Sequence, residues 1–215
     1  MQKDLFLDLG ILAGVKRDTP LILPWPIRGN PGGILSFSNS AEWQGFLLSL
    51  NLPSGIPEIV AVKFRRAQML YFLAWLYFDL IKAGELVALV TLELALKDRY
   101  GGEAKIEGEN RRKKKRRDGL KGNATCSEVY VSFANLLTHL LEDGLSDDKI
   151  PMVQRSGGGV IGLLNGDREP GLAQIRNSLA HGDPFDGFPQ GGLLELVRDL
   201  IQYAYRDMVQ PNSSH

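Results

Sequence analysis

Residues 57–102 decide the fold class. They read PEIVAVKFRRAQMLYFLAWLYFDLIKAG and then ELVALVTLELALKDRYGG. The first segment has proline at a plausible first helical position and glycine at its end, and the second ends in two glycines, which are common signals of helix boundaries. Both segments are apolar around most of their circumference, as is typical of helices at the centre of a bundle. We therefore predict two long helices, over 57–84 and 85–102.

Further amphipathic segments follow these two helices. The segment CSEVYVSFANLLTHLLEDG, residues 126–144, repeats apolar residues at helical spacing before a glycine. The last segment, GGLLELVRDLIQYAYRDMVQ, carries one apolar stripe made of Leu194, Val197, Ile201, Tyr205 and Met208. We predict an all-α helical bundle over residues 57–210, followed by a short tail, 211–215.

The first 56 residues differ in composition. Six of the eleven prolines fall before residue 58, and PLILPWPIRGNPGGILSFS mixes them with glycines in a way that no helix tolerates. The apolar runs LIL and ILSFS are candidates for a small hairpin across RGNPGG. Ser40 is a candidate N-cap for one short helix through AEWQGFLLSL. Residues 1–56 are therefore predicted to be a Pro/Gly-rich, mostly non-helical N-terminal extension.

Composition excludes several classes of protein. Lys+Arg and Asp+Glu both number 25, so the chain lacks the positive surplus of a general polyanion binder. A single cysteine, Cys126, excludes an intramolecular disulfide and a cysteine-based zinc site, and His139 and His181 lack metal-ligand spacing, so no metal is predicted. The start of the chain is a poor secretory signal, and the longest charge-free apolar stretch, 67–78, is too short for a bilayer. We expect a cytoplasmic protein without a membrane segment.

The run RRKKKRR places seven cations in succession. It lies within the stretch 101–124, which has almost no apolar residues and is predicted to be a loop insertion. The run consists of Arg111, Arg112, Lys113, Lys114, Lys115, Arg116 and Arg117. Two interpretations stay open: the cations bind RNA phosphates, or they form a solvated and self-repelling loop. A nuclear-import signal is less favoured than either.

The segment IRNSLAHGD, residues 175–183, lies in a further predicted helix. This helix is expected to begin at DREPG, with Asp167 or Glu169 as its cap, and to close at Gly182. Helical spacing at about 100° per residue places three apolar residues on its core face. They are Leu172, Ile175 and Leu179.

The other side of this helix presents a stripe of small residues, Ala173 and Ala180, with Arg176 and His181 on either side and Asn177 close by. Arginine offers planar bidentate donors to phosphate oxygens, and histidine exchanges protons near neutral pH, so the pattern suits phosphate chemistry. In the other interpretation, Arg176 pairs with an acid such as Glu93 and His181 only ends the helix, where its charge is tolerated.

The stretch RNSLAHG resembles the signature of the HEPN family, named for its occurrence in higher eukaryotes and prokaryotes: an arginine, a polar residue, and a histidine four to six positions after the arginine. Here these are Arg176, Asn177 and His181. The order of segments also resembles the family, with a helix like LVTLELALKDRYG, one like FANLLTHLLEDGLSDD, the motif helix and a closing helix. The likeness covers residues 57–210.

The resemblance implies a HEPN-like bundle and a metal-independent endoribonuclease that needs no cofactor. RNA would be cleaved by attack of its own 2'-hydroxyl at a site completed by a homodimer. His181 would move the proton, Arg176 would hold the phosphorane charge, and Asn177 would orient the phosphate or the histidine, with Glu93 as a candidate supporting acid. Such enzymes include prokaryotic toxins and antiviral defence effectors, some with an antitoxin or nucleotidyltransferase partner.

The alternative is a catalytically inactive HEPN-like module that binds RNA or a protein partner, since a fold can be kept while activity is lost. The run GGGVIG, residues 157–162, formally matches a nucleotide-binding loop. It lacks a convincing preceding strand and a helix positioned to receive a pyrophosphate, so that function is disfavoured.

Overall fold

The computed structural model describes residues 7–12, 15–117, 131–182 and 188–209, and of residues 111–117 it describes the backbone. The described chain is mostly helical, with a single two-stranded sheet among these residues. The predicted all-α character is confirmed at this level.

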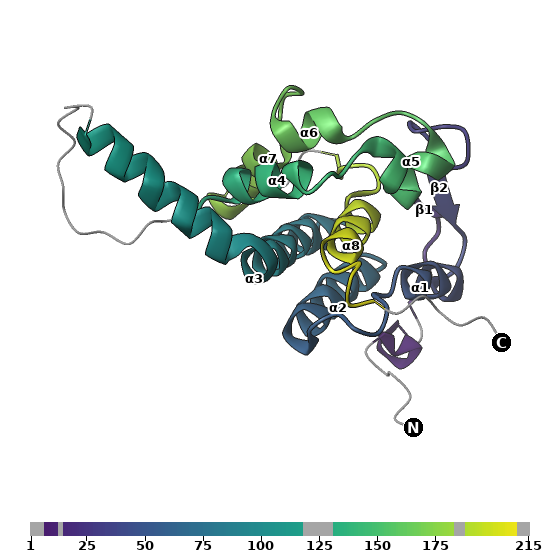
Figure 1. Cartoon of the computed structure of the whole chain (residues 1–215). Helices are drawn as coiled ribbons and strands as arrows, with labels where there is room; N and C mark the ends of the chain where they lie inside the picture. The colour runs from purple at the N-terminus through teal and green to yellow at the C-terminus, as the bar shows by residue number, and fades with distance from the viewer. Residues whose placement is uncertain (1–6, 13–14, 118–130, 183–187, 210–215) are drawn as a thin grey trace.

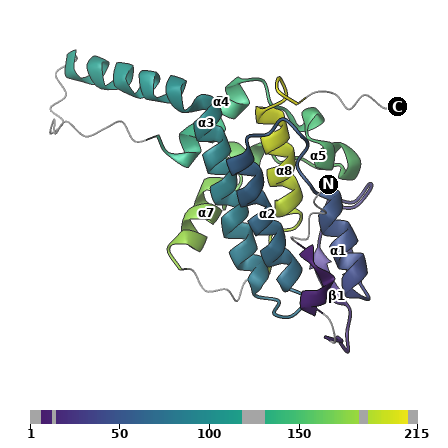
Figure 2. The ribbon, with the colours of Figure 1, turned by 90° about the horizontal axis from the view of Figure 1, so that it is seen from below.

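Helices α2 (Glu58–Leu73) and α3 (Leu80–Arg117) form a hairpin at the centre of the molecule (Figure 2). Helix α3 also contacts α4 (Phe133–Glu142), α7 (Leu172–Ala180) and α8 (Leu193–Ala204). Figure 1 shows these helices gathered around the first part of α3, while its last turns project away from the bundle. Helix α3 is therefore the central element of the fold.

The turn between α2 and α3 is at residues 74–79. The prediction that the first of these two helices ends at Gly84 was wrong. Arg17 Nη1 donates to the carbonyl of Trp75 at 2.9 Å, which satisfies a backbone acceptor at this turn. Gly84 lies inside α3, where a Cβ would be 2.6 Å from Cδ2 of Tyr71. The glycine is thus a packing position that lets α3 approach α2 closely.

Helix α3 continues through Gly101 and Gly102 to Arg117, so the predicted loop over 101–124 was wrong as far as Arg117. Residues 118–124 lie outside the described part of the chain. Apart from its glycines, the segment consists largely of Glu, Ala, Lys and Arg, which have high helix propensity. Its cations stand at the C-terminal end, where the helix dipole favours them. The apolar periodicity is absent because a helix that leaves the bundle needs no buried stripe.

The predicted hairpin is confirmed. Strands β1 (Leu21–Pro24) and β2 (Ile34–Phe37) pair antiparallel. The short helix that follows, α1 (Ser40–Ser49), is capped by Asn39, one residue before the predicted cap. Asn39 Oδ1 accepts a hydrogen bond from the N–H of Glu42 at 2.9 Å. The N-terminal region therefore contains a small sheet and a helix, with a 3-10 turn, η2 (Leu9–Leu12), ahead of them.

This N-terminal region shares its hydrophobic core with the helices. The indole N–H of Trp25 donates to Glu195 Oε2 on α8 at 2.8 Å, and the indole N–H of Trp43 donates to the carbonyl of Tyr71 on α2 at 3.0 Å. Both indole rings are buried. The extension is thus hydrogen-bonded to two helices of the bundle, α8 and α2.

Short elements connect α4 to α7: η3 (Asp147–Lys149), α5 (Pro151–Ser156) and α6 (Ile161–Asn165). The predicted stripe of the last helix is buried at Leu194, Val197, Ile201 and Tyr205. Met208 is 50% exposed and lies beyond the end of α8, so its place in the stripe was wrong. The core stripe ends where the helix ends.

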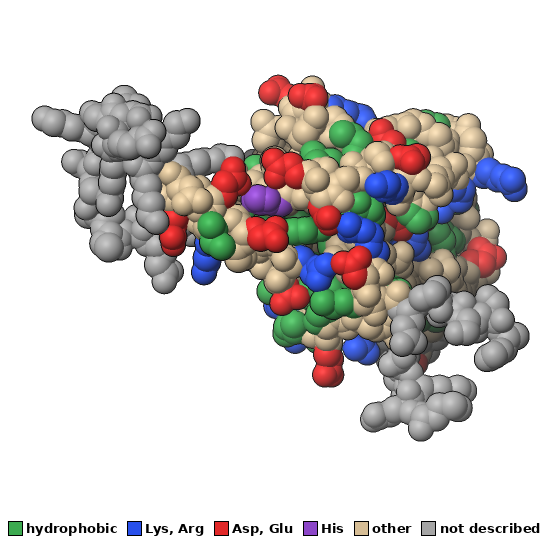
Figure 3. Space-filling view, in the orientation of Figure 1, with side chains coloured by type: hydrophobic (Ala, Val, Ile, Leu, Met, Phe, Trp, Pro, Cys, Tyr) green, Lys and Arg blue, Asp and Glu red, His purple; other side chains and the backbone are tan. Residues whose placement is uncertain are grey.

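Among the described residues, no helix is both long enough and apolar enough to cross a membrane. On the face shown in Figure 3, acidic and basic side chains are interspersed, with small groups of hydrophobic side chains between them. This mixed surface agrees with equal numbers of acidic and basic residues in the sequence.

Gly84→Ala is expected to lower the free energy of unfolding by about 1–3 kcal/mol, because the added methyl group would overlap the buried ring of Tyr71. Gly102→Ala is the matched control in the same helix, since no atom lies within 4 Å of a Cβ built there. It should raise the free energy of unfolding by about 0.5–1 kcal/mol through helix propensity. Urea denaturation followed by circular dichroism measures both, and equal effects would contradict close packing at Gly84.

Candidate functional site

Helix α7 carries the motif residues. It begins after Gly171, whose N–H donates to Gln174 Oε1 at 2.7 Å, so the prediction of Asp167 or Glu169 as its cap was wrong. Its last residue is Ala180. The predicted core face is confirmed, since three side chains are buried against the bundle: Leu172, Ile175 and Leu179. The polar residues of the motif therefore occupy the remaining circumference of the helix.

Arg176 is held by two hydrogen bonds. Its Nη2 lies 2.5 Å from Oε2 of Glu93 on α3, and its Nη1 donates to Oδ1 of Asn177 at 3.0 Å. The side chain of Glu93 is 5% exposed and that of Arg176 is 23% exposed. The buried carboxylate thus fixes the guanidinium at the edge of the solvent. The ion pair that the second interpretation of the motif predicted is present.

Lys97 completes this group, with Nζ 2.7 Å from the other oxygen of Glu93. Lys97 and Arg176 place two positive charges around one carboxylate, so the group of three carries a net charge of plus one. Two of the five N–H donors of Arg176 are engaged, and its Nε is buried without a partner in the described part of the chain. The group therefore keeps one net positive charge beside a partly exposed guanidinium.

His181 lies just past the end of α7, where its backbone N–H donates to the carbonyl of Asn177 at 2.9 Å. Its side chain is exposed and makes no hydrogen bond or ion pair with the described residues. Five residues of helix separate it from Arg176, which corresponds to about 140° of rotation and about 7.5 Å along the axis. The structure therefore brings Arg176, Asn177 and Glu93 together, and leaves His181 on another side of the helix.

The basic run at 111–117 forms the last turns of α3, in the part that projects from the bundle (Figure 1). It begins 18 residues after Glu93 on the same helix, or roughly 27 Å along the axis. The run and Arg176 are thus separate sites within one chain.

A groove of about 520 Å³ between α2 and α3 was not predicted. Its lining is mostly apolar, with two cations: Lys63, Arg66, Met69, Leu70, Leu86, Val87, Val90 and Thr91. Val90 is 38% exposed and lies less than one turn of α3 before Glu93. The groove and the carboxylate that holds Arg176 therefore lie within one turn of each other along α3. The sequence carried a signal for it, because both helices have more apolar positions than one core face can bury.

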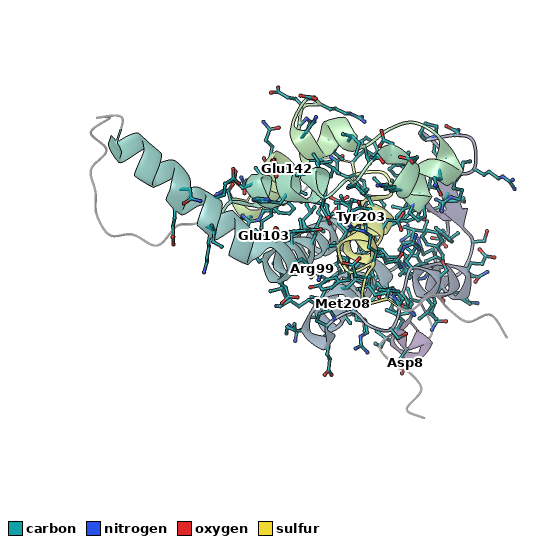
Figure 4. All side chains as sticks on the ribbon, viewed as in Figure 1. Asp8, Arg99, Glu103, Glu142, Tyr203 and Met208 are labelled. Atoms are coloured by element: carbon teal, nitrogen blue, oxygen red, sulfur yellow. The ribbon has the colours of Figure 1, made fainter. Side chains whose placement is uncertain are left out.

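A second polar cluster joins the ends of α4 and α8 and lies around the labelled Arg99 and Tyr203 in Figure 4. Arg206 bonds both oxygens of Asp143, at 2.8 and 3.0 Å, and its guanidinium stacks 4.2 Å from the ring centre of Tyr203. The hydrogen bond from Arg206 lowers the pKa of Asp143 below its ordinary value. Tyr100 also donates to Asp143 at 2.7 Å. All the charges are paired, so the cluster serves as a structural junction.

His139 lies between two carboxylates, 3.3 Å from Glu107 and 3.3 Å from Glu142, with a side chain that is 14% exposed. His139 is thus a half-buried residue of α4. Across the residues that the structure describes, no group of three or more His, Cys, Asp or Glu side chains is placed to hold a metal ion.

Comparison of the chain with protein-family models, with curated proteins and with solved structures finds no match. The assignment of function therefore depends on the geometry of α7 and its neighbours, together with the signature at Arg176, Asn177 and His181.

Glu93→Gln is expected to lower the free energy of unfolding by about 1–3 kcal/mol, because it leaves Arg176 and Lys97 without their shared carboxylate. Lys97→Gln removes a cation from the same carboxylate, but the Lys97 side chain is 44% exposed, so its loss should cost less than about 1 kcal/mol. Thermal and urea denaturation of the two variants measure the difference. A smaller loss for Glu93→Gln than for Lys97→Gln would contradict the anchoring role of Glu93.

Proposed function

We propose that the protein is an endoribonuclease of HEPN type, which cleaves RNA without a metal at a site shared by two copies of the chain. The observation that carries this proposal is the buried Glu93 that fixes Arg176 beside Asn177, next to a helix end with an exposed His181. A preorganised guanidinium stabilises charge that develops on a phosphate without further rearrangement.

In the proposed reaction the 2'-hydroxyl of the RNA attacks the neighbouring phosphorus atom and the bond to the 5'-oxygen breaks. One His181 accepts the proton of the hydroxyl, and the partner's His181 gives a proton to the leaving oxygen, since general acid and base are both needed. Arg176 neutralises the phosphorane, and Asn177 orients the phosphate. The product is a 2',3'-cyclic phosphate.

Two copies are required because one chain keeps Arg176 and His181 on different sides of α7. Ala180 is exposed and Ala173 is half-buried, so small side chains would allow a second α7 to approach. The groove between α2 and α3 adds apolar area beside Glu93 that a dimer would cover. Symmetric pairing then supplies a His181 and an Arg176 from each chain.

The resemblance of the α7 motif extends the proposal to a cellular role. We infer a cytoplasmic toxin or antiviral defence effector of a prokaryote, controlled by an antitoxin or a nucleotidyltransferase partner. The motif residues 176–182 support this role through the HEPN signature that they resemble.

A second function, that of an inactive RNA-binding or protein-interaction module, is favoured by one observation: Arg176 already has an ion-pair partner, Glu93, in the single chain. The discriminating experiment incubates purified protein with labelled RNA in the presence of EDTA and identifies the new 3' ends. Cyclic phosphate ends support the nuclease, whereas intact RNA that is retained by the protein supports the inactive module.

His181→Ala is expected to reduce cleavage by at least about 100-fold, which is a typical contribution of general acid and base catalysis. The melting temperature should stay unchanged, because the side chain is exposed and has no side-chain partner in the described structure. Arg176→Lys should reduce cleavage by at least about tenfold, since a point charge does not replace bidentate contact. Ser178→Ala, on the exposed side of the same helix, is the control. Full activity of His181→Ala would overturn the proposed mechanism.

Neutralising four of the seven cations at 111–117 is expected to weaken RNA binding and to flatten the slope of log affinity against log salt by roughly 0.7 per lost contact. The cleaved bond should stay the same, because phosphate contacts fix position and affinity without selecting the scissile bond. Filter binding at several salt concentrations measures the slope. An unchanged slope would assign the RNA affinity to another surface.

A further inference from the structure

A pocket of about 430 Å³ lies away from the α7 site, where the N-terminal hairpin and α1 meet α5 and α8. Its volume is within the range of small-molecule sites, roughly 300–1,000 Å³. Its lining includes apolar side chains, among them Trp25, Phe46 and Leu50, and charged side chains, among them Arg155 and Arg198. We call the first set the apolar wall and the second set the polar wall.

Glu195 organises the polar wall. Its side chain is 2% exposed and accepts from Arg155 Nη1 and Nη2 at 2.5 and 2.9 Å, from Trp25 Nε1 at 2.8 Å and from Arg198 Nη2 at 3.2 Å. Burial opposes ionisation of Glu195, but the hydrogen bonds from Arg155 and Trp25 outweigh it and lower its pKa below the ordinary value. A charged carboxylate therefore holds both guanidinium groups in place at the pocket.

The polar wall has more positive than negative charge. Behind it, Asp199 pairs with Arg198 at 2.6 Å and accepts from the N–H of Met152 at 2.8 Å. Arg28 also lines the pocket, is exposed, and has no side-chain partner among the described residues. Three guanidinium groups thus face at most two carboxylates, which leaves at least one positive charge for a ligand.

The apolar wall is built from packed aromatic rings. Trp25 and Phe46 meet edge to face, with ring centres 5.0 Å apart and planes at 86°. Trp25 is 3% exposed, so its ring is held by the core on one side and borders the pocket on the other. An apolar or aromatic group of a ligand would be buried against this wall.

We propose that this pocket binds a small monocarboxylate with an apolar body, with its charge near Arg28 and Arg198 and its hydrocarbon part against Phe46 and Leu50. The site is independent of the proposed ribonuclease site, because it shares no residue with α7. A ligand there would touch both the N-terminal hairpin and α8, and would stabilise the folded chain by mass action.

The test uses protein labelled with 5-fluorotryptophan, because one of its three tryptophans, Trp25, lines the pocket and Trp75 lies outside its lining. Titration with 1-naphthylacetate is expected to shift the fluorine resonance of Trp25 with saturation, while that of Trp75 stays fixed. The neutral analogue 2-(1-naphthyl)ethanol should bind about tenfold more weakly, because it lacks the charge that the arginines recognise. Acetate, which lacks the apolar body, should also bind more weakly.

Arg28→Gln should weaken binding of 1-naphthylacetate by about tenfold, whereas Arg168→Gln should leave it unchanged. Arg168 is a matched control, since it is also exposed, lies outside the pocket and makes no side-chain hydrogen bond or ion pair in the described structure. The proposal is overturned if the Trp25 resonance does not move, if the alcohol binds as tightly as the acid, or if both variants bind alike. None of these outcomes depends on cleavage of RNA.

Discussion

The close approach of α3 to α2 at Gly84 is the constraint on which the rest of the structure depends. The ring of Tyr71 on α2 occupies the space that a side chain at residue 84 would need, so it packs directly against the backbone of α3 there. With α3 fixed in this way, its other faces present Glu93 to α7 and Asp98 to α8, where the hydroxyl of Tyr205 donates to Asp98 at 2.7 Å. A shift of α3 would disturb both contacts together, because protein interiors are closely packed and transmit displacement.

The Arg176 site and the pocket at Glu195 have one feature in common, a buried carboxylate that holds an arginine at the edge of the solvent. Glu93 holds Arg176, and Glu195 holds Arg155 and Arg198. Burying an ion pair contributes little stability relative to apolar packing, but it fixes the position of the charged groups. An arginine fixed in this way loses little further entropy when it binds an anion. The sites differ in their surroundings, since one lies beside an exposed histidine and the other beside aromatic rings.

Much of the fold follows from local sequence. Helical spacing identifies the buried side of α7 through Leu172, Ile175 and Leu179, and two short apolar runs on either side of RGNPGG identify the β1–β2 hairpin. The glycines were misread because the same residue type ends helices and permits close packing. Gly84 serves the second purpose, and only the ring of Tyr71, which sequence spacing does not locate, distinguishes the two.

The candidate sites also differ in whether local sequence or tertiary packing determines them. Glu93 was named beforehand as an acid for Arg176, and the ion pair forms across 83 residues of sequence. The separation of His181 from Arg176 follows from helix geometry alone. In contrast, the pocket at Glu195 left no local signal, because its walls come from residues that are far apart in the chain. Such sites form only when the chain folds, and the hydrophobic periodicity of the sequence does not predict them.

The hydrogen bond between Trp25 and Glu195 also affects the order in which the chain can fold during synthesis. The two residues are separated by 170 positions, so the indole has no partner until α8 has left the ribosome. At about 5–20 residues per second, that interval is roughly 10–30 s. Throughout it the indole N–H of Trp25 lacks the carboxylate that it bonds in the folded chain. Helix α8 must therefore be made before the tryptophan that follows β1 can form its buried hydrogen bond.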